Sequence, residues 1–293
     1  MSDLSRRQFL GGSILALLAP GAALESLGTK RLTRFGLVTD VHFARTPARG
    51  TRYYEDSFAK LTEATAHFRS LKTDCVIELG DLIDSAPGVD AKGEIKFLET
   101  INQVLTTGAP KTGYVMGNHC VTTVPKPDFL SAVGQRRGNT SFEVGDWHVV
   151  ILDACHKADG TSYEPGKFTV PDTTIPEGQI QWLESRLHST KKHTLVFCHQ
   201  RLDWTTPERP GTGVISAPQV RRVLEASGRV RAVFMGHTHQ NDLTQINGIP
   251  YVTLRAMVEG KGAENSGYSD LLAYSDGSLL LKGFREQLSR VVR

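Results

Sequence analysis

The chain has 293 residues, with 34 Lys and Arg against 31 Asp and Glu, so its net charge is only +3. That balance gives no sign of the basic surface that long nucleic acids or anionic membranes require, and we expect no long nucleic acid as a partner. Hydrophobic residues make up 39% of the chain and charged residues 22%, which excludes a disordered protein. Four cysteines in this length exclude a small fold held by disulfides.

The N-terminus carries a basic pair followed by a short apolar run. Arg6 and Arg7 stand in the sequence S-R-R-Q-F-L, which is typical of a twin-arginine export signal. The apolar run is about half the length that spans a bilayer, so we expect no stable membrane anchor. We therefore expect residues 1–23 to be a cleaved signal peptide, the export machinery to be a partner, and the mature protein to be periplasmic or extracellular. The alternative is an accidental Arg pair before an ordinary signal or a weak anchor.

Short apolar runs alternate with stretches of helical periodicity along the rest of the chain. Strands are predicted at 34–39, 75–79, 112–116, 140–144, 147–152, 193–197 and 231–235. Helices are predicted at 56–71, 94–105, 176–187 and 217–226. The C-terminal part is predicted to be rich in strands, at 243–246, 249–254, 270–274 and 278–284. This order indicates an α/β fold.

Five predicted strands end in short polar clusters. In open α/β sheets, side chains at the carboxyl ends of strands gather at one edge, so we expect these clusters to form one metal-binding crevice. Asp and His together favour Mn, Zn, Fe or Ni over Ca. An extended chain would point both members of each Asp-x-His or His-x-His pair the same way. The clusters are Asp40-x-His42, Gly80-Asp81-x-x-Asp84, Gly117-Asn118-His119, His199 and Gly236-His237-x-His239.

Each cluster taken alone has a plain structural explanation. Gly-Asp is usually a turn, and a single His after an apolar strand is usually a hydrogen-bonded core residue. Five clusters in one order, each after a predicted strand, favour a shared site instead.

The ordered set D-x-H, G-D-x-x-D, G-N-H, H and G-H-x-H resembles the calcineurin-like metallophosphoesterase superfamily, across a domain at residues 32–285. The resemblance implies an α/β fold, a four-layer α-β-β-α sandwich of two mixed sheets flanked by helices. It also implies two divalent metal ions, Mn foremost, with Fe, Zn or Ni as alternatives. One ion would be held by Asp40, His42, Asp81 and His239, and the other by Asp81, Asn118, His199 and His237.

The resemblance implies a hydrolase. Two adjacent cations lower the pKa of a shared water, which then attacks phosphorus as hydroxide. His119 would act as the catalytic residue that protonates the leaving group. Asp84 is expected to lie behind the metal ligands and orient one of them.

Two departures from the family pattern affect this site. Purple acid phosphatases place a Tyr where this chain has Asp84, which argues against a ferric site. Cys120 stands behind the site where the family usually has a carboxylate, and a thiol can hold His119 only weakly. Either another carboxylate holds His119, or general-acid catalysis is weaker and better leaving groups are favoured.

Residues between the motifs resemble the manganese-dependent ADP-ribose/CDP-alcohol diphosphatase branch, among them Arg52-Tyr53-Tyr54 and Val258-Glu259. His42 instead matches the class III cyclic-nucleotide phosphodiesterase branch. Both resemblances imply a small phosphorylated substrate that is nucleotide-like, cleaved at a phosphodiester or phosphoanhydride. Arg52 could meet a phosphate and Tyr53 or Tyr54 could stack on a base, unless both tyrosines only pack the start of a helix. The alternatives are a phosphomonoesterase of broad specificity and a non-catalytic binding scaffold, although scaffolds usually have incomplete ligand sets.

Overall fold

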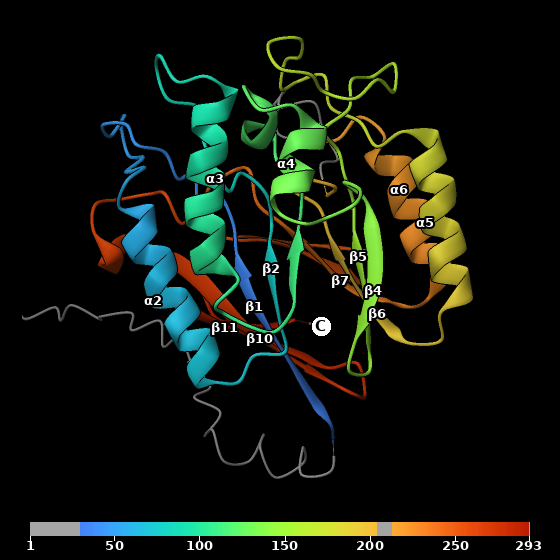
Figure 1. The fold of residues 1–293 in the computed structure, drawn as a ribbon. Coiled ribbons are helices and arrows are strands. Elements are labelled where there is room, and N and C mark those ends of the chain that lie inside the picture. The colour runs from blue at the N-terminus through green and yellow to red at the C-terminus, as the bar shows by residue number, and fades with distance from the viewer. Residues whose placement is uncertain (1–29, 204–212, 293) are drawn as a thin grey trace, which may run out of the picture. The chain divides into compact units, whose positions relative to one another are not determined.

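The computed structural model describes residues 30–203 and 213–292, so the expected signal peptide lies outside the described residues. Residues from Arg31 onward form one compact unit. Two six-stranded sheets make up its centre, and helices cover them (Figure 1). Among the residues described, no helix is both long enough and apolar enough to cross a bilayer.

The first sheet has the strand order β12-β11-β10-β1-β2-β3. Strands β1, β2 and β3 run parallel, while β10, β11 and β12 are added antiparallel. Their bounds are β1 (Leu32–Val38), β2 (Cys75–Glu78), β3 (Thr112–Tyr114), β10 (Gly267–Tyr274), β11 (Leu279–Arg285) and β12 (Arg290–Val292).

The second sheet has the order β4-β5-β6-β7-β9-β8. Strands β5, β6, β7 and β9 are parallel, and antiparallel strands β4 and β8 form the two edges. Their bounds are β4 (Thr140–Val144), β5 (Trp147–Ile151), β6 (His193–Phe197), β7 (Val230–Met235), β8 (Asp242–Ile246) and β9 (Ile249–Thr253).

Helices cover the outer face of each sheet, which gives four layers (Figure 1). One apolar cluster joins the first sheet to α2 (Ser57–Ser70), α3 (Ala91–Leu105) and α4 (Lys126–Ala132). Another joins the second sheet to α5 (Glu177–Ser189) and α6 (Ala217–Ser227). Two short 3-10 helices complete the described elements, η1 (His119–Val121) and η2 (Ala263–Asn265).

The third apolar cluster fills the space between the sheets, and strand periodicity explains it. In β1, Phe35 and Leu37 point into this cluster, whereas Val38 belongs to the cluster under α2. Gly36 also faces α2, where a Cβ would lie 2.7 Å from the ring of Phe68. The expected four-layer sandwich of two mixed sheets is therefore confirmed.

One α-helix and one strand of the structure are absent from the sequence prediction. Helix α4 has only seven residues and begins after Pro125, so it is too short to show a clear 3.6-residue pattern. Strand β12 has three residues at the edge of its sheet.

Candidate dinuclear metal site

The predicted polar clusters lie at the carboxyl ends of β1, β2 and β3 in one sheet and of β6 and β7 in the other. Within the described part of the chain, three groups of side chains place possible ligand atoms within 4.8 Å of one another. The first group is Asp40, His42 and His239, the second is Asp81, His199 and His237, and the third is His42, Asp84 and His119.

Five of the predicted ligands have left-handed backbone conformations, which L-residues rarely adopt. Their φ angles are 50° at Asp40, 46° at His42, 59° at Asp81, 69° at His237 and 61° at His239. The expectation that an extended chain aims each pair is therefore wrong. The left-handed turns decide the aim, and His237 and His239 belong to different groups.

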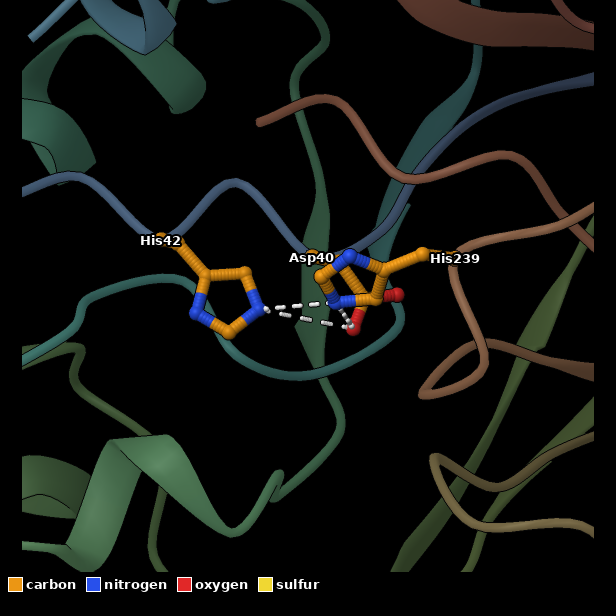
Figure 2. Close-up of side chains that lie close together, drawn as sticks. All are labelled: Asp40, His42 and His239. Atoms are coloured by element: carbon orange, nitrogen blue, oxygen red, sulfur yellow. Dashed lines mark hydrogen bonds and ion pairs between the residues drawn. The ribbon is translucent and has the colours of Figure 1, made fainter. Parts of the chain in front are cut away.

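In the first group, the side chains of Asp40, His42 and His239 point toward one another (Figure 2). The Nε2 atoms of His42 and His239 are 3.2 Å apart, and Asp40 Oδ1 lies 3.3 Å from the His239 Nε2. The Nδ1 of His42 donates to Asp84 over 3.0 Å, and that of His239 donates to Glu259 over 2.6 Å. The two Nε2 atoms therefore face each other and Asp40 Oδ1, as ligand atoms around a shared cation would.

The second group is built around the Asp81 carboxylate. Its Oδ2 lies 3.0 Å from His199 Nε2 and 3.7 Å from His42 Nε2, so it reaches toward both groups. His199 Nδ1 donates to the backbone oxygen of Leu79 over 2.8 Å, which turns Nε2 toward Asp81. The rings of His199 and His237 are 5.0 Å apart. This is the arrangement expected if Asp81 bridges two cations.

Buried polar atoms without hydrogen bonds test whether these residues fit metal ions. Asp40 Oδ1, Asn118 Oδ1 and His199 Nε2 are buried and make no hydrogen bond among the described residues, although Asp40 Oδ1 and His199 Nε2 lie close to His239 and Asp81. Leaving such an atom unsatisfied costs about 1–3 kcal/mol, so a stable fold normally provides a partner. All three atoms belong to predicted metal ligands, and the site therefore fits two cations.

The electrostatics of the site are dominated by its carboxylates. Burial by itself lowers the pKa of His199 and His239, but nearby carboxylates raise each pKa to about 9. These carboxylates are Asp81 and Asp40 for His199, and Asp40 and Glu259 for His239. Burial opposes ionisation of Asp81, yet the His199 and His119 rings hold its pKa far below the ordinary range. The site therefore attracts positive charge strongly.

His119 lies at the edge of the site, with 27% of its side chain exposed. Its backbone N–H donates to Asp81 Oδ1 over 2.7 Å, and its Nδ1 donates to Asp84 Oδ1 over 2.8 Å. Burial opposes ionisation of Asp84, but its hydrogen bonds to His119 and His42 hold its pKa well below the usual range. Asp84 is therefore a carboxylate that orients both rings.

Cys120 does not hold His119, which corrects the expectation that it supports the site. Its side chain is fully buried in the apolar cluster under the helices, and burial raises the pKa of its thiol. Of the two alternatives left open by the sequence, the structure supports the one in which another carboxylate, Asp84, serves.

The three predicted substrate contacts differ in position. Arg52 Nη1 lies 3.7 Å from Asp84 Oδ2, and 33% of its side chain is exposed. Tyr54 is only 5% exposed and packs in the apolar cluster under the helices, so the prediction that it stacks on a base is wrong. Tyr53 is half-buried, and its role stays a prediction.

Glu259 is a functional candidate to which the sequence gives no role. It follows β9 in a loop and accepts the Nδ1–H of His239. The only signal was its place in a motif shared with the diphosphatase branch. The backbone oxygen of Leu79, which orients His199, carries no sequence signal at all.

Comparisons with known proteins agree with this geometry. A sequence model described as "Calcineurin-like phosphoesterase" matches residues 33–241. A manganese-dependent ADP-ribose/CDP-alcohol diphosphatase of zebrafish (Danio rerio) is 24% identical over 288 residues, covering 77% of this chain and 87% of the relative.

Solved structures show the same fold. A dimetal phosphatase from Danio rerio superposes with a TM-score of 0.74 at 21% identity, covering 89% of this chain and 99% of that one. A purple acid phosphatase from yellow lupin (Lupinus luteus) seeds gives a TM-score of 0.57 at 16% identity, covering 90% of this chain and 53% of that one.

Proposed function

Because the chain belongs to the calcineurin-like phosphoesterase family of metal-dependent hydrolases, we propose that it cleaves a phosphodiester or phosphoanhydride bond in a small nucleotide-like molecule. The observation that carries this proposal is the convergence of ligand atoms within 4.8 Å of one another, in one group from Asp40, His42 and His239 and in a second from Asp81, His199 and His237. One cation would be held by Asp40, His42, Asp81 and His239, and the other by Asp81, Asn118, His199 and His237.

The donor set suits several divalent ions. Imidazole nitrogens with carboxylate and amide oxygens accept Mn, Fe, Zn or Ni. We propose manganese, in agreement with the name of the zebrafish relative. When bound, the two cations lower the pKa of water and neutralise the phosphate oxygens.

The protein's own residues would orient the substrate and move the proton. The His119 side chain is partly exposed while Asp84 holds its Nδ1, so Nε2 would be the atom that donates a proton to the leaving oxygen. This pairing supports His119 as the general acid despite the neutral Cys120 beside it.

Arg52 supports a substrate with a second phosphate. Its guanidinium lies at the rim of the site and remains one-third exposed. A guanidinium in this place can bind the phosphate that is not attacked, whereas a phosphomonoester offers no such group. Replacing it (R52M) is therefore expected to lower kcat/KM for ADP-ribose about 10- to 100-fold, and to affect bis-p-nitrophenyl phosphate much less.

A substrate panel tests the proposed function. Purified protein with Mn²⁺ is assayed on ADP-ribose, CDP-choline, cyclic AMP, bis-p-nitrophenyl phosphate and p-nitrophenyl phosphate, before and after chelation. D81N, which removes the proposed bridging charge, is the inactive control. We expect chelator-sensitive hydrolysis of a nucleotide-like substrate. Turnover of only p-nitrophenyl phosphate would favour the phosphomonoesterase, and activity that survives exhaustive chelation would reject metal-dependent hydrolysis.

We also propose that the protein is exported by the twin-arginine route to the periplasm or beyond. The support is the S-R-R-Q-F-L sequence at Arg6 and Arg7, followed by a short apolar run. Replacing both arginines by lysine should leave the full-length chain in the cytoplasm of a bacterial host, as judged by fractionation. Unchanged export of the double variant would exclude this route.

A further inference from the structure

Lys60 is a fully buried lysine of α2, with 0% of its surface exposed. Its Nζ donates to the backbone oxygens of Met257 (2.9 Å), Glu259 (2.9 Å) and Gly260 (2.7 Å). These bonds use all three ammonium protons. Burial lowers the pKa of Lys60 to about 8 against the opposing charges of Asp56 and Glu259, so the group is an ammonium at neutral pH.

The segment that Lys60 holds, residues 257–260, touches the first group of metal ligands in two places. The backbone N–H of Val258 donates to the backbone oxygen of Asp40 over 3.0 Å. The Glu259 carboxylate accepts the Nδ1–H of His239 over 2.6 Å. One contact supports the backbone of a ligand, and the other sets the ring orientation of a second ligand.

Both ligands need such support. The φ angles of Asp40 (50°) and His239 (61°) lie in the left-handed region. Each such residue costs about 1–3 kcal/mol and keeps its conformation only when its surroundings hold it. A segment fixed by three charge-assisted hydrogen bonds provides a rigid support of this kind.

We propose that Lys60 is a positioning residue for the cation held by Asp40, His42 and His239, and that it acts through Glu259. This inference rests on the proposed function and adds an asymmetry between the two metal positions. Loss of the ammonium would loosen this position, while the one built from Asp81, Asn118, His199 and His237 keeps its own supports, such as the Leu79 oxygen behind His199.

The test measures Mn²⁺ binding to the full chain after its metal has been removed by chelation. Calorimetry gives the affinities, and metal analysis at limiting Mn²⁺ gives the number of tightly bound ions. Wild-type protein is expected to bind two ions. Lys60→Met should keep one tight ion and bind the other about 10- to 100-fold more weakly, the usual effect of losing a residue that orients ligands. Two tight ions in Lys60→Met would overturn the proposal.

Lys126→Met is the matched control. Lys126 also donates from a largely buried ammonium, to Asp153 Oδ2 (2.8 Å) and to the Cys155 backbone oxygen (2.9 Å), but it lies on α4. This variant should lose stability and still bind two ions tightly. A selective loss of one ion here as well would assign the effect to general loosening of the fold and overturn the proposal.

The route through Glu259 is tested by a double-variant cycle. If Lys60 acts by placing this carboxylate, Lys60→Met combined with Glu259→Gln should weaken Mn²⁺ no more than the stronger single variant. If the losses of Mn²⁺ affinity in the two single variants add up in the double variant, Lys60 does not act through Glu259.

Folding of the variants is checked by circular dichroism. Should Lys60→Met fail to fold, Lys60→Arg keeps the charge and several donors. We expect this variant to fold and to bind Mn²⁺ more weakly at the position formed by Asp40, His42 and His239. Failure of both to fold would assign Lys60 to the fold and overturn its positioning role. If the wild-type protein binds no Mn²⁺, the proposed function is overturned. If the wild type binds two ions and Lys60→Met also binds two ions tightly, only the role of Lys60 is overturned.

Discussion

His42 and His119 are held by the two oxygens of a single carboxylate, that of Asp84. His42 Nδ1 lies 3.0 Å from Oδ2, and His119 Nδ1 lies 2.8 Å from Oδ1. Their rings meet edge to face with centroids 4.6 Å apart. A proposed metal ligand and the proposed general acid are therefore oriented by the same group, and a change at Asp84 should affect both.

Asp84→Asn is expected to weaken one metal position and to reduce turnover, each by about 10- to 100-fold. The two Nδ1–H groups meet different oxygens of Asp84, and in the amide one of these oxygens is replaced by an NH2 donor, so one ring loses its acceptor. Mn²⁺ titration and steady-state kinetics measure the two effects, with the exposed Asp128→Asn as control. A loss of turnover with normal metal affinity would mean that Asp84 serves His119 alone.

His119→Ala should lower turnover by about 100- to 10,000-fold and leave the metal content unchanged. The reduction should be smaller for bis-p-nitrophenyl phosphate, because p-nitrophenolate leaves without a proton. His188→Ala, on the exposed face of α5, is the control. If metal analysis finds an ion missing in His119→Ala, this residue is a ligand and its assignment as the acid is wrong.

Metal removal should make stability depend on pH in a predictable direction. The folded-state pKa values of His199 and His239 are raised from the ordinary 6.5 to about 9, so the folded state binds their protons more tightly. Their stabilisation is complete below about pH 6.5 and is lost as pH rises through about 9. The Tm of the chelated protein should therefore fall over this range, while Mn²⁺ should reduce the fall by replacing the protons. A Tm that stays constant without metal would contradict the raised pKa values.

Gly117→Ala should abolish metal binding at the two cation positions that Asp81 is proposed to bridge. A Cβ on Gly117 would lie 2.2 Å from Asp81 Oδ1, so the carboxylate would have to move. Gly178→Ala is the matched control, because no atom lies within 4 Å of a Cβ there and the residue is in α5. The control should bind two Mn²⁺ ions and be as stable as wild type or up to about 1 kcal/mol more stable. Normal Mn²⁺ binding by Gly117→Ala would show that Asp81 tolerates the shift.

The fold could be predicted from the sequence because its strands are buried and regular. Alternation in β1 places Phe35 and Leu37 between the sheets, and the polar residues that end each strand mark where it stops. Helix α4 was missed because seven residues carry too little periodicity. Tyr54 was misplaced as a substrate contact because an aromatic residue before a helix gives no local sign of whether it faces the core or solvent.

The sequence by itself determined the family resemblance, the two-sheet architecture and the identity of the candidate ligands, since these depend on residue types and their order. Only the tertiary structure decided which partner orients each ligand: Asp84 for His42 and His119, and Glu259 for His239. The physical reason is that these contacts join residues far apart in the chain, through backbone turns of positive φ. A local pattern specifies a strand and the polar residue at its end, but the direction of that side chain is set by the surrounding packing.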